Sequence, residues 1–374
     1  MTMQSSTAAK NPSGDHPEPV DDAARKLRRL NAAGYLRDDT LPALEAVASQ
    51  FAVAITPRML DVIDPQNPDD PVARQFLPDV RELECRHEER TDPIGDERYS
   101  PVPGIVHRYP DRALLLPLRV CPVYCRFCFR RETIGSVENG LLSSKELQNA
   151  MAYIREHTEI WEVILSGGDP LMLSARRMER ILLELRSIDH VRVIRIHSRV
   201  PLVAPERISQ RMIQILRAAV PIFVVLHCNH PREFTAAGAL ACAQLVDAGI
   251  PMLSQTVLLR GINDDIETMT KLLRQLVEHR IKPYYLHHGD RARGTGHFRT
   301  RISTGQKLIA RLHGNVSGIC QPTYVLDIPG GYGKTPIGPG YIDSGSDGIY
   351  DVTDYRGRQH VYNDTGQKSE FGTS

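Results

Sequence analysis

The sequence predicts an α/β fold in which strand–helix units repeat along the chain and form a parallel sheet, closed or partly closed as a barrel. From residue 113 onward, short runs rich in Val, Ile and Leu alternate with longer stretches of helical period. Polar residues follow the end of each strand run, as in Gly167-Gly168-Asp169 and His197-Ser198-Arg199. Because right-handed crossovers put the helices outside, these strand ends share one face, where barrel enzymes carry their chemistry.

The first 110 residues do not show this rhythm. Residues 1–20 are expected to form a disordered tail, and residues 21–110 an accessory region of helices and proline-rich chain. Helical patterns occur at 23–36 and 41–51, and Thr56-Pro57 is typical of a helix start. Seven prolines between residues 65 and 103 forbid long regular elements. This segment is predicted to wrap over the folded body.

The barrel domain is expected at residues 111–315. Its predicted strands are 113–118, 163–165, 191–196, 222–226, 252–258 and 284–286. Its predicted helices are 145–157, 175–188, 206–219, 234–248, 266–279 and 306–312. Residues 316–374 are expected to add one more strand at 324–328, a glycine-rich loop, and a hairpin from 349 to 363 around Arg356-Gly357.

Composition argues against several classes of partner. The 374 residues contain 46 Lys and Arg against 45 Asp and Glu, so no global positive charge favours nucleic acid. The apolar runs are far shorter than the ~20 residues that span a bilayer, and the N-terminus lacks the apolar core of a signal peptide. We therefore expect a cytoplasmic protein that acts on a small molecule.

Three of the seven cysteines, Cys121, Cys125 and Cys128, are separated by four and three positions directly after the first strand. Structural zinc usually needs four N or S ligands, whereas three thiolates holding a [4Fe–4S] cluster leave one iron open. An open iron can chelate S-adenosylmethionine. The alternative is a buried helical stripe of small apolar side chains, but Pro122 favours a loop.

This spacing and its position resemble the radical S-adenosylmethionine (SAM) superfamily. Gly167, Gly168 and Asp169, after the second strand, resemble the glycine motif that holds the amino end of SAM in that superfamily. Taken alone, these three residues could be only a tight turn.

Further motifs resemble the lysine 2,3-aminomutase family. They lie at 108–112, 125–131, 165–170, 258–263, 283–286, 296–299 and 327–334. The resemblance covers residues 45 to 345 and implies an open (β/α)6 partial barrel of the TIM type. It also implies pyridoxal phosphate as a second cofactor, and a radical reaction that moves the 2-amino group of L-lysine to C3.

Lys334 lies in the glycine-rich segment 329–334. A phosphate-binding loop would need glycine at position 328, but this position is occupied by Ile328, so the nucleotide-binding motif is excluded. A lysine that a flexible loop delivers to a barrel mouth suits a Schiff base with an aldehyde cofactor. Without the surrounding family motif, a solvated loop lysine would be the simpler interpretation.

The resemblance also implies roles for two groups of basic residues. Arg130 matches the arginine that pairs with the substrate carboxylate, for which a planar guanidinium is suited. Arg108 and Arg112 are implied at the cofactor phosphate, with surface ion pairs as the alternative.

His230 and Gln255 match positions near SAM, although both could be satisfied buried polar side chains. Asp290 and Asp327 match the positions that hold the distal ammonium of lysine. A helix cap or a pair with Arg291 or Arg293 is the alternative, more so for Asp290.

Two anions in one pocket require a cationic substrate and disfavour glutamate. Lysine is the first choice and arginine the second. Formation of β-lysine for modification of elongation factor P, and a non-catalytic iron–sulfur redox protein, are further alternatives.

An electron donor for the cluster is implied as a partner. A homo-oligomer would lack interchain zinc, since no cysteine follows Cys320 and Asp265 stands where longer relatives place a thiol.

Overall fold

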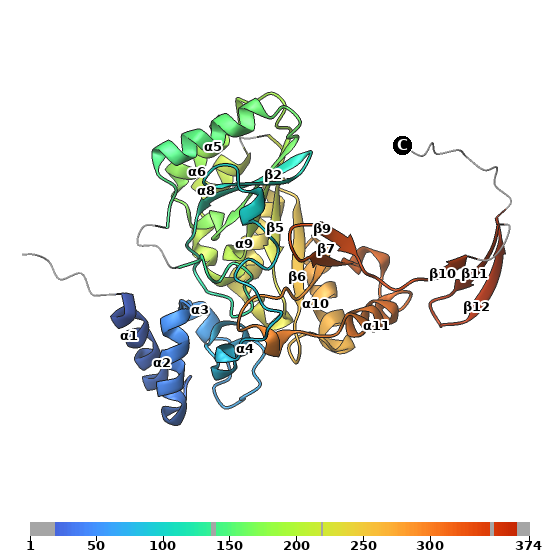
Figure 1. Cartoon of the computed structure of the whole chain (residues 1–374), viewed down its shortest axis with the longest axis horizontal. Helices are drawn as coiled ribbons and strands as arrows, with labels where there is room; N and C mark the ends of the chain where they lie inside the picture. Colours follow the sequence, from blue (N-terminus) through green and yellow to red (C-terminus); the bar gives the residue numbers. More distant parts are fainter. Residues whose placement is uncertain (1–18, 136–139, 218–219, 345–347, 365–374) are drawn as a thin grey trace, which may run out of the picture.

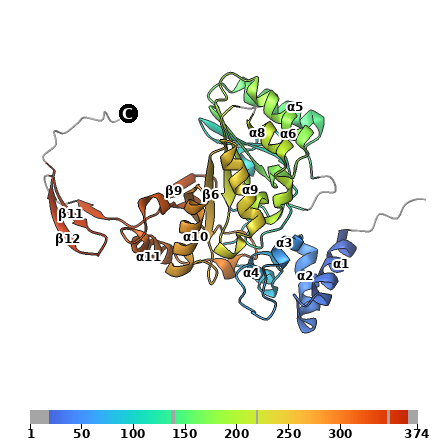
Figure 2. The ribbon, with the colours of Figure 1, turned by 180° about the vertical axis from the view of Figure 1, so that it is seen from behind.

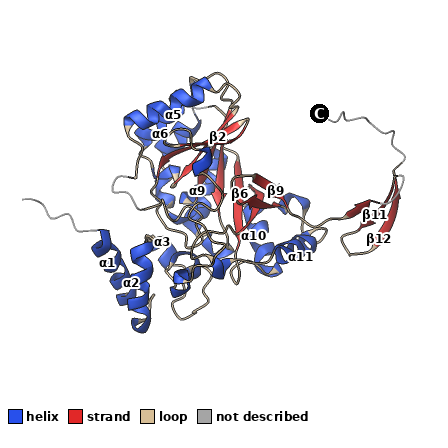
Figure 3. Cartoon of the chain, in the orientation of Figure 1, coloured by secondary structure: helices blue, strands red, loops and turns tan. Residues whose placement is uncertain are grey.

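The computed structural model describes residues 19–135, 140–217, 220–344 and 348–364. Its centre is a nine-stranded sheet in which neighbours along the chain are neighbours in space, from β1 to β9. The strands are β1 (Ile105–Tyr109), β2 (Arg112–Leu118), β3 (Glu162–Gly167), β4 (Val193–Ser198), β5 (Ile222–His227), β6 (Met252–Leu258), β7 (Ile281–His288), β8 (Thr323–Ile328) and β9 (Gly333–Pro336). Strands β2 to β8 pair in parallel, which confirms the parallel strand–helix array. The sheet curls into a nearly closed barrel with helices outside it (Figure 3).

Two strands that the sequence pattern did not indicate lie at the edges of this sheet. Strand β1 pairs antiparallel with β2, and β9 pairs antiparallel with β8. Both are short, and neither has the alternating apolar residues from which a strand is recognised.

Helices cover the outer face of the barrel (Figure 2). They are α5 (Ser144–Glu156), α6 (Ala175–Arg186), α8 (Gln210–Arg217), α9 (Ala236–Asp247), α10 (Ile266–Glu278) and α11 (Ile302–Leu312). Each buries one apolar stripe; in α5 the stripe is Leu147, Ala150, Met151 and Ile154. A hydroxyl cap starts several of them, such as Ser143, which accepts from Glu146 N.

The predicted bounds differ from the observed ones where local turns intervene. The helix predicted at 206–219 begins at Gln210, because Pro205–Arg207 form a separate 3-10 turn, and its residues 218–219 lie outside the described residues. The helix predicted from 306 begins at Ile302. The sequence did not indicate this first turn, because Gly305 is a poor helix former. In the structure Gly305 allows close packing against the Tyr324 side chain.

The N-terminal region consists of short elements, as its prolines predict. Its helices are α1 (Pro19–Ala32), α2 (Leu41–Gln50), α3 (Pro57–Leu60) and α4 (Ala73–Phe76). Thr56 caps α3 by accepting from Met59 N. Of the tail expected at 1–20, residues 1–18 lie outside the described residues, and 19–20 belong to α1.

After the barrel, β10 (Ile342–Ser344), β11 (Ile349–Thr353) and β12 (Gln359–Asn363) form a second antiparallel sheet. The hairpin of β11 and β12 confirms the one predicted around Arg356-Gly357. This sheet stands away from the barrel (Figure 1). Within the described ranges, no helix combines the length and the apolar character needed to cross a membrane.

Candidate active site

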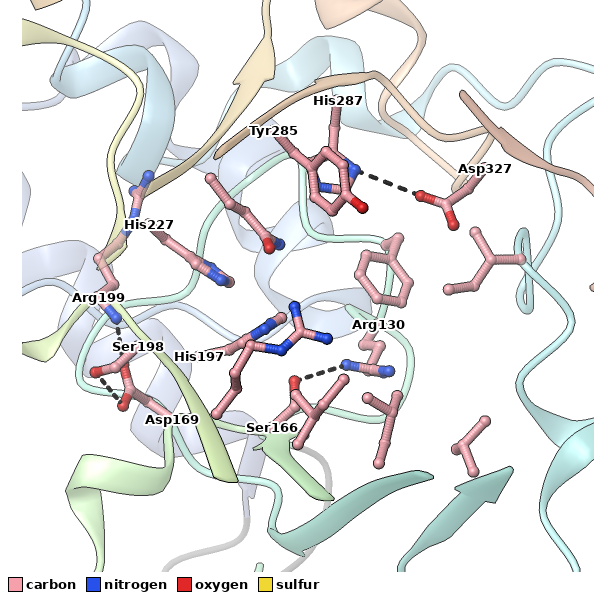
Figure 4. A pocket seen from close by; sticks show the side chains of 18 of the residues that line it. Arg130, Ser166, Asp169, His197, Ser198, Arg199, His227, Tyr285, His287 and Asp327 are labelled. Carbon is pink, nitrogen blue, oxygen red and sulfur yellow. Dashed lines mark hydrogen bonds and ion pairs between the residues drawn. The ribbon is translucent and has the colours of Figure 1, made fainter. Parts of the chain in front are cut away.

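A cavity of about 800 Å³ occupies the interior of the barrel. It brings together nearly all the residues that the sequence singled out; Figure 4 labels Arg130, Asp169 and Asp327 among them. These are Arg108, Arg112, Cys121, Cys125, Cys128, Arg130, Gly167, Gly168, Asp169, Gln255, Asp290, Asp327 and Lys334.

The three cysteines lie on the connection between β2 and α5, in a segment of turns rather than a helix. The alternative of a buried helical stripe is therefore wrong. Burial raises the pKa of the Cys125 thiol to about 11, and it also raises the pKa values of Cys121 and Cys128. The guanidinium of Arg199 partly opposes this effect at Cys125. Three thiols that face one cavity, with arginine charge nearby, fit an iron–sulfur cluster, whose iron would convert them to thiolates.

The Gly167-Gly168-Asp169 turn packs against the chain that leads to Cys121. Gly168 N donates to Leu118 O at 2.8 Å, and Asp169 N donates to Val120 O at 2.9 Å. A Cβ atom on Gly168 would lie 2.4 Å from Val120 O, so only glycine allows this approach. The glycine motif therefore positions the cysteine segment.

The carboxylate of Asp169 is occupied by internal hydrogen bonds. It accepts from Ser198 Oγ and from Arg199 N, both at 2.7 Å, and burial raises its pKa. Asp169 thus ties the end of β3 to the end of β4, as the dashed lines in Figure 4 show for Ser198 and Arg199.

Asp96, which no sequence pattern singled out, joins two of the predicted arginines. Its Oδ1 accepts from Arg108 at 3.0 Å, and its Oδ2 pairs with Arg130 at 2.8 Å. Arg130 also donates to Ser166 Oγ at 3.3 Å. The third arginine, Arg112, lies over the Tyr109 ring, 3.9 Å from its centroid.

Lys334 belongs to strand β9, so the prediction of a loop lysine is wrong. Its cross-strand partner is Asp327, whose Oδ1 lies 2.8 Å from Lys334 Nζ. Lys334 N donates to Tyr109 Oη at 2.6 Å, which joins the two edge strands of the sheet, β1 and β9, at the cavity wall. The sequence did not indicate this strand, because the flanking glycines have no side chains and so produce no alternation of apolar and polar residues.

Two carboxylates with different environments lie beside Lys334. Burial alone would raise the pKa of Asp327, but the hydrogen bond with His287 and the charge of Lys334 hold that pKa below its ordinary value. Burial and the neighbouring Asp327 raise the pKa of Asp290 to about 8. Among the described residues, Asp290 neither caps a helix nor has an arginine within ion-pair distance, which argues against its structural alternatives.

Three histidines, of which His287 is buried and the other two are half-buried, add polar groups that the sequence analysis gave no role. His197, His227 and His287 line the cavity, and the Nε2 atom of each has no hydrogen-bond partner. Burial lowers the pKa of all three, for His227 to about 3, so the rings are neutral. A bound ligand would supply the missing partners.

His230 is the predicted site residue that the structure does not bring into the cavity. Its ring nitrogen Nδ1 accepts from Arg232 N at 3.1 Å and caps the 3-10 turn Pro231–Glu233. The structure therefore favours the alternative stated for His230, a buried polar side chain that is hydrogen-bonded within the protein. Gln255 does line the cavity and is half-buried.

Comparison with known proteins gives matches over most of the chain. Residues 115–273 match the Radical SAM superfamily model, and residues 309–370 match the family model Lysine-2,3-aminomutase. The L-lysine 2,3-aminomutase of Clostridium subterminale is 44% identical over 79% of this chain and 70% of its own. The L-lysine 2,3-aminomutase of Escherichia coli is 35% identical over 85% of this chain and 92% of its own. The glutamate 2,3-aminomutase of Clostridioides difficile is 38% identical over 80% of this chain and 71% of its own.

Proposed function

Because the chain belongs to the lysine 2,3-aminomutase family of radical SAM enzymes, we propose that it moves the 2-amino group of L-lysine to C3 to give β-lysine. Enzymes of this superfamily use a [4Fe–4S] cluster and SAM. Pyridoxal phosphate is the second cofactor of the proposal.

The contact between Asp327 and Lys334 is the observation that best supports lysine as the substrate. An alkylammonium group already lies 2.8 Å from Asp327 Oδ1, in a cavity wall where the carboxylate is buried. This internal pair supports a role for Asp327 as the partner of an ammonium ion. In the proposed function, Asp327 would hold the distal ammonium of the lysine substrate, and Lys334 would hold the aldehyde carbon of the cofactor.

Arg130 supports the recognition of the other end of the substrate. Its guanidinium lines the cavity, pairs with Asp96 and donates to Ser166 Oγ, the second contact being drawn in Figure 4. Because Nη1 donates to Ser166 Oγ and Nη2 lies beside Asp96 Oδ2, a substrate carboxylate would accept from the second N–H group of each Nη atom. An α-amino acid with a cationic side chain therefore finds a cation for its carboxylate and an anion for its ammonium in one cavity.

The remaining lining residues fit the cofactors. Cys121, Cys125 and Cys128 would hold the cluster, and Gly167 and Gly168 would approach SAM with their backbone. Arg108 and Arg112 would bind the phosphate of pyridoxal phosphate, and Lys334 its aldehyde carbon. When bound, the cluster and SAM supply the radical that removes an unactivated hydrogen, and pyridoxal phosphate carries the migrating nitrogen.

Asp290 and Asp327 distinguish this pocket from one for glutamate. A side-chain carboxylate placed beside them would meet the negative charge of Asp327 at low dielectric, and ionisation of Asp290 would add to the repulsion. Arginine meets the charge requirement, so it is the second candidate.

The test is anaerobic reconstitution followed by parallel assays with lysine, arginine and glutamate. We expect turnover of lysine to be the fastest and turnover of glutamate to be absent. Borohydride reduction and peptide mapping should place the pyridoxal label on Lys334. Lys282 is the control, because its Nζ already donates to Ile319 O and Gln321 O. A label on Lys282, or a preference for glutamate, would refute the proposal.

A further inference from the structure

A second group of potential ligands lies outside the cavity. His107, His157 and Glu159 each offer one ligand atom, and these three atoms lie within 4.8 Å of one another. The residues come from β1, from the C-terminal cap of α5, and from the loop that leads to β3. Neither the sequence motifs nor the proposed function accounts for them.

The strand geometry separates this group from the active site. Val106, Arg108 and Tyr109 line the cavity, whereas His107 does not and instead contacts Tyr153 of α5, on the opposite face of β1. There His107 meets the end of α5, and its ring lies edge-on to the His157 ring, with centroids 5.7 Å apart.

Tyr153 orients both imidazoles. Its backbone carbonyl is 2.8 Å from His157 Nδ1, and its hydroxyl is 2.9 Å from His107 Nδ1. Because a carbonyl can only accept, His157 Nδ1 carries the proton and its Nε2 carries the free lone pair. The His157 ring also stacks on Tyr153, with centroids 3.8 Å apart, which restricts its rotation. Such outer partners are typical of metal-binding histidines.

Glu159 supplies the negative charge. A turn in which Ile160 N donates to His157 O at 3.1 Å presents His157 and Glu159 close together. Glu159 is exposed, whereas the two histidines are half-buried. The C-terminal end of α5, with its partial negative charge, further favours a cation here.

We propose that His107, His157 and Glu159 bind a divalent transition-metal ion of the zinc class on the outer face of β1. Two imidazoles and one carboxylate select such ions over Mg²⁺ and Ca²⁺, and they leave a fourth position for water. Ligands of tetrahedral zinc are roughly 3.3 Å apart, so small side-chain rotations would close the site. The ion would tie edge strand β1, which carries Arg108, to the end of α5.

The proposal is tested by anaerobic calorimetric titration of Zn²⁺ into the reconstituted holoenzyme, with its cluster already loaded. We expect one Zn²⁺ per chain in addition to the cluster, and a rise in the unfolding temperature on binding. His157→Gln and Glu159→Gln should each weaken binding at least ten-fold. His87→Gln and Glu156→Gln change exposed side chains of the same types and should leave it unchanged.

Co²⁺ identifies the ligand type. We expect the visible bands of a tetrahedral site without the near-ultraviolet thiolate band, which excludes binding at Cys85 or another cysteine. Circular dichroism and uncoupled cleavage of SAM check that each variant is folded. If the holoenzyme binds no additional Zn²⁺, or if both ligand variants bind it as tightly as the parent, the site does not exist.

Discussion

Asp327 and Lys334 face each other across the last strand pair of the sheet, with 2.8 Å between Oδ1 and Nζ. His287 approaches the other carboxylate oxygen at 3.4 Å. The carboxylate is therefore held ionised inside the cavity. It serves first as the partner of Lys334 and, in the proposed function, as the partner of the substrate ammonium.

Asp327→Asn should lower kcat/KM for lysine by about 30-fold or more, because a buried charge-assisted hydrogen bond contributes about 2 kcal/mol. Uncoupled cleavage of SAM should change little. The control is Asp343→Asn, in the exposed strand β10. Normal turnover of lysine by the Asp327 variant would contradict the assignment of the pocket.

The raised pKa of Asp290, about 8, predicts a pH-dependent affinity for lysine. At pH 7 this carboxyl group is mainly protonated in the free enzyme, and a bound ammonium would favour its ionised form. Binding should therefore release protons, and affinity should increase between pH 6 and pH 9. Calorimetry in buffers of different ionisation enthalpy measures the proton count, and Asp290→Asn should abolish the release. If the enzyme takes up protons when lysine binds, the predicted direction of the pH dependence is wrong.

Asp96 is a positioning residue, because it holds Arg108 and Arg130 without any proposed contact of its own with substrate. Asp96→Asn should raise KM for lysine about 10-fold or more, since the two half-buried guanidinium groups lose their shared anion. The rate of uncoupled SAM cleavage should be kept, which separates positioning from general damage to the fold. Asp247→Asn removes an exposed pair with Arg280 and should have no effect.

Gly168→Ala should abolish SAM cleavage. Its new methyl group would meet the backbone of Val120 at 2.4 Å, so the segment that carries Cys121 must move. Loss of the cluster absorbance after reconstitution would report this displacement. Gly318→Ala meets no atom within 4 Å and is the matched control. A Gly168 variant with a normal cluster and normal cleavage would contradict the packing argument.

Glu82→Gln should destabilise the protein by about 3–5 kcal/mol, as expected when one partner of a buried ion pair is removed. Glu82 is fully buried and accepts from Arg126 Nη2 at 2.6 Å and from Arg131. Urea unfolding measures the loss, and Glu179→Gln, in an exposed pair with Arg211, is the control.

The same carboxylate predicts acid sensitivity. Burial alone would raise the pKa of Glu82, but the two guanidinium groups hold it below the ordinary 4.5. The stability from this group is therefore present above that pH and is lost as the pH falls below it. The parent should lose more stability than Glu82→Gln on acidification, and equal losses would argue against this role.

The features that depend on neighbouring residues follow from the amino-acid sequence alone. The period of the apolar residues predicted the parallel strands and their helices, and it placed β6 at 252–258, as observed. The cysteine spacing predicted an iron–sulfur cluster, and the surrounding motifs predicted the family to which the chain belongs. Such patterns can be recognised because secondary structure and motif spacing are local properties.

The tertiary structure alone decided how irregular segments meet. Asp96 and Glu82 lie in the proline-rich region, yet one joins the arginines of the cavity and the other anchors the cysteine segment. Tyr109, on the first strand of the barrel sheet, contacts Lys334 on the last strand of that sheet. These contacts depend on the path of a chain that has no period, so no local pattern encodes them. The ordered barrel could be predicted, whereas the residues that close it and orient its charges could not.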